Sequence, residues 1–582
     1  MAKNLSPQKN FTASPSAQLA LIASLSGLIY LLVFTLPFPL PWFYTTIPPV
    51  DYTKLTNYSI SGFVAYVAGL GALFWLYIWA VWLTISAGEQ GSRRAEEQRN
   101  YNDAGLRSPV SGQLVGVSCA VLTVILLFSY PVTAIDLFIY AIRTRGWALY
   151  GLNPLTTAPE TLPAADPWLG LAAEWVDAPS PYGPLWEWLS LAAFHLSGGS
   201  FLSHLFALKI LAVLAYLGCA WLIFRIMRQI QPRWAITATI AFAWSPLVLL
   251  ETVQNGHNDI IMVFFLLTAV WALEEAQRRR GEEPKKDAAN TSGLRFAFLL
   301  PTSYSLLPTP YFLLLACLFL ALSILVKFVT VLVVPFFLLA LTVHEVKWPK
   351  RLILMSGYGL LIAILVILPL LPLWPGWDNW AVLQAGSGAG RSLLALLVLG
   401  LKDTWGVNFA FDFSRNLLLG LYALIYLSLL VRGQGSGVGG QPVVSSQKSV
   451  VSNQRSVISN LPTFQSSNLP TFQPSNLPTL HSSFHILFWY VLLAAPVFHA
   501  WYLLWFLPLA VLLLPNRRPL IAATVFSITA LFIIPYFETV RVWYPVLLHN
   551  QFLGHLIGAP LLMVPPALAL LWPISRSPKS EV

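Results

Sequence analysis

The stretch AQLALIASLSGLIYLLVFTL, residues 17–36, contains no charged side chain and is long enough to cross a bilayer as one helix. Residues 60–86 form a second such stretch, and others follow to the end of the 582-residue chain. Hydrophobic residues make up 57% of the sequence and charged residues only 10%, which excludes an ordinary soluble globular protein. Because another apolar stretch follows 17–36 and no small-residue cleavage site is evident, we interpret 17–36 as a first span and not as a secretory signal.

The apolar stretches predict an all-α, polytopic transmembrane helical bundle with about 12–14 spans. Each stretch is bounded by polar or turn-forming residues, as expected for a helix that ends at a membrane surface. The predicted spans are 17–36, 60–86, 112–132, 201–224, 234–251, 258–274, 308–326, 329–343, 352–373, 416–432, 484–499, 501–515, 519–536 and 555–573.

The distribution of charge predicts how the bundle is oriented. The net charge is +10, and the basic residues lie in short loops between apolar stretches, which is typical of the cytoplasmic side of a membrane protein and not of a nucleic-acid-binding patch. With the amino terminus inside, residues 133–200 form a large extracytoplasmic loop. This loop is acidic: it contains Asp136, Glu160, Asp166, Glu174, Asp177 and Glu187 but only two arginines, Arg143 and Arg145. Its apolar part, 184–198, is too short for a span and predicts an interfacial or re-entrant helix.

Two further features organise the chain. The three cysteines, Cys119, Cys219 and Cys317, all lie in apolar stretches without paired spacing, so we expect neither disulfides nor a thiolate metal site. Residues 433–482 are rich in Gly, Ser and Gln and predict a disordered cytoplasmic linker. The expected parts are two amino-terminal spans with a cytoplasmic loop (1–111), a membrane core containing the outer loop (112–432), this linker, and carboxy-terminal spans (483–582).

The start of the outer loop contains the first candidate for chemistry. If the segment is helical, Asp136, Tyr140 and Arg143 are spaced four and three residues apart and share one face. A carboxylate in this position could act as a general base on a hydroxyl group, with Arg143 or Arg145 available for a phosphate. The alternative is that Asp136 only complements a helix amino terminus and that Arg143 extends to the membrane surface.

Further candidates lie at the predicted outer ends of helices. Each has a structural alternative: a turn, a helix cap, a membrane-edge cation or an interfacial aromatic belt. They are Asn153 in Gly-Leu-Asn-Pro, Tyr182 in Pro-Tyr-Gly-Pro, the adjacent His257, Asn258 and Asp259, the isolated Lys327, and His499, Trp501 and Tyr502 in His-Ala-Trp-Tyr-Leu-Leu-Trp. We expect His257 to bind a sugar or phosphate, because no second histidine stands at metal-ligand spacing.

In their order along the chain, these motifs resemble the GT-C superfamily of membrane glycosyltransferases, and most closely the polyprenol-phosphomannose-dependent α-(1→6)-mannosyltransferases. The match consists of Asp136-x-x-x-Tyr140, Gly151-x-Asn-Pro, Trp175 followed by Ala-Pro-Ser-Pro-Tyr-Gly-Pro-Leu, and His257-Asn-Asp-x-x-Met262. The late His-Ala-Trp-Tyr-Leu-Leu-Trp stretch is similar to an outer-loop feature of related families.

The resemblance implies an inverting transfer in the plasma membrane, on its extracytoplasmic side. A polyprenyl-phosphate sugar, with mannose as the expected sugar, would be the donor, and a glycan or glycolipid would be the acceptor. Asp136 matches the acidic position that activates the acceptor hydroxyl. Membrane lipids are expected partners, whereas nucleic acid, metal and other cofactors are not. The alternative is a transporter or flippase of lipid-linked saccharides, whose polar groups would lie near the bilayer midplane.

Overall fold

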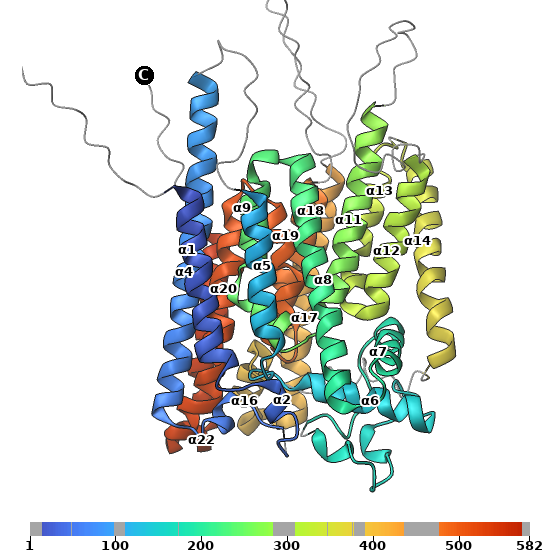
Figure 1. Ribbon diagram of the computed structural model, residues 1–582. Helices are drawn as coiled ribbons and strands as arrows, with labels where there is room; N and C mark the ends of the chain where they lie inside the picture. Colours follow the sequence, from blue (N-terminus) through green and yellow to red (C-terminus); the bar gives the residue numbers. More distant parts are fainter. Residues whose placement is uncertain are drawn as a thin grey trace, which may run out of the picture.

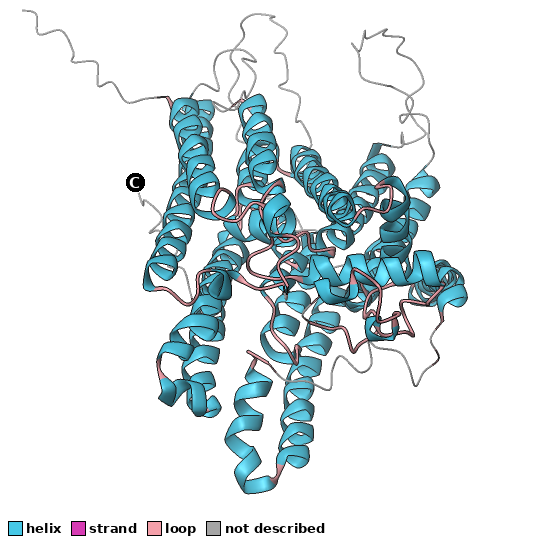
Figure 2. Ribbon diagram, turned by 60° about the horizontal axis from the view of Figure 1, so that its bottom comes forward, coloured by secondary structure: helices cyan, strands magenta, loops and turns pink. Residues whose placement is uncertain are grey.

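The computed structural model describes residues 14–47, 49–97, 111–172, 174–282, 309–345, 347–374, 376, 390–435 and 477–572. Within these residues the chain forms helices and loops but no β-strand, as Figure 2 shows, and only two isolated β-bridges occur, Pro39 with Ser129 and Gly390 with Val497. The predicted all-α class is therefore confirmed.

Eight helices are long and apolar enough to cross a membrane, and a ninth span results if one bent pair of helices is counted. The long helices are α1 (Pro15–Ile29, continued by η1, Tyr30–Thr35), α4 (Ile60–Glu97), α8 (Phe201–Ile230), α12 (Thr309–Val326), α14 (Trp348–Leu370, then η8, Leu371–Leu373), α17 (Val407–Gly435), α20 (Arg517–Pro535, then η12, Tyr536–Val540) and α23 (Gln551–Leu571). The bent pair consists of η4 (Pro232–Trp234) with α9 (Ala235–Ala243), and α10 (Pro246–Val248) with η5 (Leu249–Gln254). The polytopic bundle is thus confirmed.

The remaining helices, of which α11 with 24 residues is the longest, complete the bundle and its surroundings. Those within the bundle are α5 (Gly112–Leu127), α11 (Asp259–Glu282), η7 (Phe328–Val333), α13 (Val334–Leu341), α18 (Leu477–Trp489), η10 (Tyr490–Ala494), η11 (Ala500–Trp505) and α19 (Leu507–Leu512). The others are α2 (Leu40–Phe43), α3 (Tyr52–Leu55), α6 (Asp136–Tyr150), η2 (Pro159–Thr161), η3 (Leu169–Leu171), α7 (Pro184–Leu196), α16 (Leu393–Trp405), α21 (Arg541–Trp543) and α22 (Pro545–His549). Each of the 14 predicted spans overlaps at least one of these helices, and 234–251 overlaps all four segments of the bent pair. The predicted count of 12–14 exceeds the eight or nine spans found among the described residues, because five predicted spans fall on helices outside that count: 112–132, 329–343, 484–499 and 501–515 on apolar helices of 10–17 residues, and 258–274 on α11.

The loop between α5 and α8 lies at one end of the bundle, where α6 runs across the helix axes and α7 packs beside it (Figure 1). The end of α8 that carries Arg228, and the start of α9, lie at the opposite end (Figure 1). The loop 133–200 and the basic end of α8 thus lie at opposite ends of the bundle, and which end faces the cytoplasm stays a prediction. The predicted short helix at 184–198 is also present, as α7.

The structure describes only the two ends of the segment predicted to be a disordered linker. Of the predicted linker 433–482, residues 436–476 lie outside the described residues, while α17 includes 433–435 and α18 includes 477–482. The division of the chain into the four parts stays a prediction.

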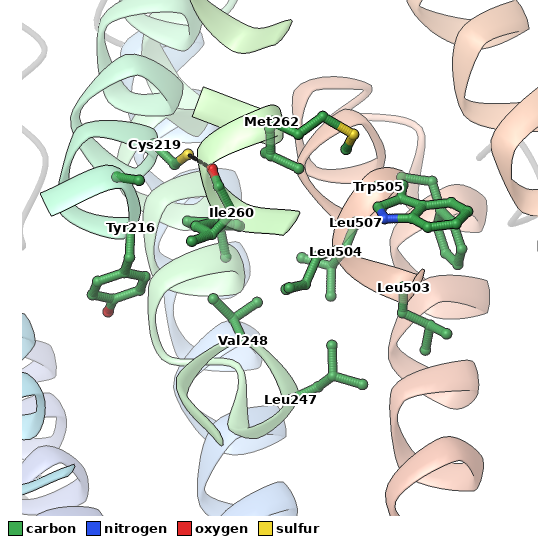
Figure 3. Packing of buried hydrophobic residues seen from close by; sticks show 14 of the residues in the cluster. Tyr216, Cys219, Leu247, Val248, Ile260, Met262, Leu503, Leu504, Trp505 and Leu507 are labelled. Carbon is green, nitrogen blue, oxygen red and sulfur yellow. Dashed lines mark hydrogen bonds between the residues drawn. The ribbon is translucent and has the colours of Figure 1, made fainter. Parts of the chain in front are cut away.

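The core joins distant parts of the sequence. One continuous cluster of buried apolar side chains includes Cys219 of α8, Ile260 of α11, Val248 of α10 and Leu504 of η11. Figure 3 shows these residues facing one another, with the Cys219 thiol 3.8 Å from the Ile260 carbonyl oxygen. The carboxy-terminal segment around η11 is therefore packed against α10 and the amino end of α11. The three cysteines are buried and unpaired, as the sequence predicts.

Candidate functional site

Asp136 is the first residue of α6, and its side chain is partly exposed at the end of the bundle. Partial removal from water raises the pKa of this carboxyl above its ordinary value, while electrostatic interactions with His257, Lys327 and Arg143 act in the opposite direction. His257 and Lys327 come from other segments of the chain. Three of the predicted residues therefore lie within electrostatic reach of the predicted base.

The turn between η5 and α11 brings three polar side chains into the protein interior. Gly256 has φ of +74°, a conformation that favours glycine, and a Cβ there would lie 3.0 Å from a methyl carbon of Leu137 in α6. The sharp turn points His257, Asn258 and Asp259 inward, and none of the three is exposed. Both amide atoms of Asn258 and one carboxylate oxygen of Asp259 have no hydrogen-bond partner in the protein. Such buried polar atoms are costly, which marks this turn as a candidate binding site.

Lys327 follows the last residue of α12 and contacts both the turn before α11 and the Pro-Tyr-Gly-Pro corner. Its ammonium donates to Asp259 Oδ1 at 2.7 Å, and the indole of Trp505 donates to the same oxygen. The ammonium also lies 5.3 Å from the ring centroids of Tyr182 and Trp505 and 5.4 Å from that of Tyr502, which are cation–π distances. Only 15% of the lysine side chain is exposed. Because the side chain is enclosed, the position of its positive charge is fixed.

The Pro-Tyr-Gly-Pro corner places Tyr182 beside this lysine. The amide of Gly183 donates to the carbonyl of Val326 at 3.0 Å, and a Cβ on Gly183 would lie 2.0 Å from the carbonyl oxygen of Leu325. Only glycine fits so close to the end of α12. The hydroxyls of Tyr182 and Tyr140 are 3.1 Å apart, so the corner is also joined to α6.

A stack of rings lies next to the turn. The indole of Trp501 lies between two imidazoles, with ring centroids 4.0 Å from that of His257 and 4.2 Å from that of His499. Behind His257, its Nε2 atom is 3.3 Å from the Oε2 atom of Glu251, an ion-pair distance, and Asn255 donates to the same oxygen at 2.9 Å. The imidazole of His257 is therefore held by stacking and lies next to a carboxylate, while neither of its ring nitrogens has a hydrogen-bond partner in the protein.

Three other predicted residues use most of their polar atoms within the fold, although Nε of Arg143 has no hydrogen-bond partner in the protein. Arg143 donates to three backbone carbonyls of the loop 175–179, at 3.0 to 3.4 Å. Arg145 forms a salt bridge with Asp166, at 2.7 Å, and its guanidinium lies over the Trp168 ring. Asn153 accepts a hydrogen bond from the Leu155 amide and donates to the Leu373 carbonyl. These contacts favour a scaffolding role, so a substrate contact by any of the three stays a prediction.

Two residues in the site were missed from the sequence. Glu251 is fully buried beside His257, and Trp505 bonds to Asp259. A lone carboxylate at the end of an apolar stretch is a signal that could have identified Glu251. Trp505 belongs to the quoted aromatic stretch, but its indole partner could not be known before the fold. Among the described residues, no group of three or more His, Cys, Asp or Glu side chains could hold a metal ion.

Fold and site together define a polytopic helical membrane protein with a carboxylate, two imidazoles and an aromatic-enclosed lysine at one end of its bundle. Residues 41–343 match the family model described as α-(1→6)-mannopyranosyltransferase, N-terminal domain, and the chain belongs to this family. The matched region contains every predicted site residue from Asp136 to Lys327, whereas His499, Trp501 and Tyr502 lie outside it.

A relative with a curated description has the same activity in its name. It is a probable α-(1→6)-mannopyranosyltransferase of Mycolicibacterium smegmatis, 24% identical over 151 residues, which are 25% of this chain and 26% of that protein. The match thus spans about a quarter of the relative's length. No solved structure matches the chain.

Proposed function

We propose that this protein is a membrane glycosyltransferase that transfers mannose from a polyprenyl-phosphate donor to a glycan or glycolipid acceptor on the extracytoplasmic face. The observation that carries the proposal is the position of Asp136, which is open to the end of the bundle and lies within electrostatic reach of His257 and Lys327. Membership of the mannosyltransferase family supports the same activity.

The proposed step is a single displacement with inversion at the sugar. Asp136 takes the proton of the acceptor hydroxyl, and the resulting oxygen nucleophile attacks C1 of the donor sugar. The bond between C1 and the phosphate oxygen breaks, and the lipid phosphate leaves as an anion. No metal or cofactor enters this scheme.

The cation of the site suits the leaving group. Lys327 is held by Asp259 and by three aromatic rings, so its charge does not need to reorganise as negative charge develops on the departing phosphate. The stacked Trp501, with His257 and His499 on its two faces, gives the donor sugar a rigid boundary. These features concentrate at one end of the bundle, whereas a transporter would need comparable polar groups near its middle.

The test measures transfer of radiolabelled mannose from polyprenyl-phosphate mannose to an α-(1→6)-linked mannan oligosaccharide by the purified protein. Wild type is compared with Asp136→Asn and with Glu160→Gln, which changes an exposed carboxylate of η2 in the same loop. We expect Asp136→Asn to lose about 10²- to 10⁴-fold in rate and Glu160→Gln to match wild type. Equal rates for Asp136→Asn and wild type would remove Asp136 from the mechanism. No transfer from this donor, together with movement of the lipid across vesicles, would support the transporter.

The side of the membrane has its own test. The three native cysteines are buried, so a cysteine introduced at exposed Glu160 can be labelled selectively. A membrane-impermeant maleimide applied to intact cells should label Glu160→Cys but not Arg233→Cys, which lies in η4 at the other end of the bundle. The reverse pattern would contradict an extracytoplasmic site.

A further inference from the structure

The loop that precedes the Pro-Tyr-Gly-Pro corner contains an unusual backbone conformation. Trp175 has φ of +63°, in the left-handed region that bulky residues rarely adopt. Such a conformation persists only where surrounding contacts hold it, and these conformations cluster at functional sites. The contacts that hold this loop are therefore informative.

The loop backbone is fixed from its inner side. The buried Arg143 guanidinium donates to the carbonyls of Trp175, Ala178 and Pro179, and the Val176 carbonyl accepts from the amide of Glu160 at 2.8 Å. At the end of the loop, the amide of Ser180 donates to the Pro154 carbonyl at 2.8 Å. Its hydroxyl donates to the buried carboxyl of Glu187 at 2.6 Å. All of these hydrogen bonds involve the loop backbone or the Ser180 hydroxyl, and none of them involves the Trp175 indole.

Trp175 remains exposed although its backbone carbonyl is held by one of these anchors. Its side chain is 48% exposed, whereas Trp168 in the same loop is 6% exposed and packs against Phe194 and Phe201. The neighbouring Glu174 is also exposed. The loop backbone is held in a strained conformation, while the indole of Trp175 and the carboxylate of Glu174 stay at the surface. Neither side chain contributes to the core, and we call these two residues the platform.

This platform is joined to the helix that carries the proposed base, because Arg143 of α6 donates to the Trp175 carbonyl at 3.4 Å and Asp136 is the first residue of the same helix. Crowding by the protein raises the pKa of Glu174 above its ordinary value, and the negative charge of Asp136 is the next cause. Lys54, Asp51 and Glu538 also act electrostatically on Glu174.

We propose that Trp175 and Glu174 form a binding subsite for the acceptor saccharide, with the indole stacked on a pyranose ring and the carboxylate accepting hydrogen bonds from its hydroxyls. The ring bound here is the one next to the sugar whose hydroxyl Asp136 deprotonates. An indole face suits the apolar C–H face of a sugar, and a carboxylate suits its hydroxyl edge. This inference rests on the proposed function, because it assigns the acceptor of that reaction.

Trp188 provides a matched control, since it is 46% exposed but belongs to α7, where its ring packs 4.7 Å from that of Trp147. Binding of a short α-(1→6)-linked mannan oligosaccharide is measured by calorimetry on the purified, turnover-deficient Asp136→Asn protein, alone and with Trp175→Ala, Trp175→Phe, Glu174→Gln or Trp188→Ala. We expect Trp175→Ala to weaken binding roughly tenfold, Trp175→Phe and Glu174→Gln to weaken it less, and Trp188→Ala to leave it unchanged. In the active protein, Trp175→Ala should raise KM for the acceptor but not for the donor.

The outcomes separate the two proposals. Saccharide binding that depends on Trp175 in a protein that transfers no mannose would keep the subsite and overturn the transferase. Mannose transfer with unchanged acceptor binding in Trp175→Ala, or equal losses in Trp175→Ala and Trp188→Ala, would overturn the subsite and show that both indoles act as interfacial membrane anchors. If Trp175→Ala does not fold, Trp175→Phe and Glu174→Gln decide: binding identical to the parent in both would also overturn it.

Discussion

The arginines of α6 and the turn that precedes α11 both contain several polar atoms. They differ in how many of those atoms have partners within the protein. Arg143 and Arg145 donate to loop carbonyls and to Asp166, so their charges hold the outer loop together. In the turn, the amide of Asn258 and one oxygen of Asp259 have no partner within the protein. Each buried polar atom left unpaired costs about 1–3 kcal/mol, so a fold that gathers several in one turn is expected to satisfy them with a ligand. The comparison teaches that charge alone does not identify a binding residue.

Among the residues of the turn before α11 and their partners, Lys327 is expected to have the largest effect on the rate of transfer. Lys327→Met removes the cation beside Asp259, and we expect the rate of mannose transfer to fall about 10²- to 10³-fold, as when a single stabilising group for developing charge is lost. Lys327→Arg should retain part of the activity, because it keeps the charge. The rate is measured at saturating donor with protein of verified folding. Wild-type rates in Lys327→Met would show that the leaving phosphate does not need this cation.

On the scaffold side, Glu187 predicts a dependence of stability on pH. Burial raises the pKa of Glu187 to about 7, opposed by its bond from Ser180 and the charge of Arg143. Because the folded pKa lies above the unfolded one, the folded state loses stability as pH rises from about 4.5 to about 7, by about 3 kcal/mol. Glu187→Gln keeps the acceptor for Ser180 and should remove this loss. Thermal unfolding of both proteins at pH 5 and pH 8 tests it, and equal pH dependence in the two would refute the assignment.

A smaller effect is expected from the unpartnered amide. Asn258→Ala removes both polar atoms and should lower kcat/KM for transfer by roughly tenfold, as for loss of a hydrogen bond to a ligand, with little change or a gain in thermal stability. Steady-state kinetics and thermal unfolding of one preparation give both values. A loss of stability without loss of activity would place Asn258 with the scaffold and would break the comparison.

Much of the fold could be predicted from the sequence, because a spanning helix is specified by local apolar length. The helical start at Asp136 and the short helix at 184–198 also followed from local pattern. The use of Arg143, Arg145 and Asn153 could not be predicted, since their partners are loop carbonyls, Asp166 and the Leu373 carbonyl, which only the tertiary fold brings close.

The candidate site shows the same limit. The sequence indicated His257, Asp259 and Lys327 as polar groups at helix ends, but not that Lys327 is enclosed by Tyr182, Tyr502 and Trp505. Those rings come from segments about 145 residues before and 175 residues after the lysine, and no local pattern encodes such a meeting. Glu251 was missed for a different reason: its position among apolar residues made it look like the end of a span.

The central claim is that Asp136 performs the chemistry, whereas the hydrogen-bonded Asp166 holds the loop. Two aspartates of the same loop test it most directly: Asp136, whose carboxylate accepts no hydrogen bond from another residue in the part of the chain that the structure describes, and Asp166, which binds Arg145, Tyr150 and the Trp168 amide. The measurement is the rate of mannose transfer and the thermal unfolding midpoint for Asp136→Asn and Asp166→Asn. The account predicts that Asp136→Asn loses about 10²- to 10⁴-fold in rate with an unchanged midpoint, and that Asp166→Asn lowers the midpoint while its folded fraction keeps its rate. The opposite pattern would contradict it.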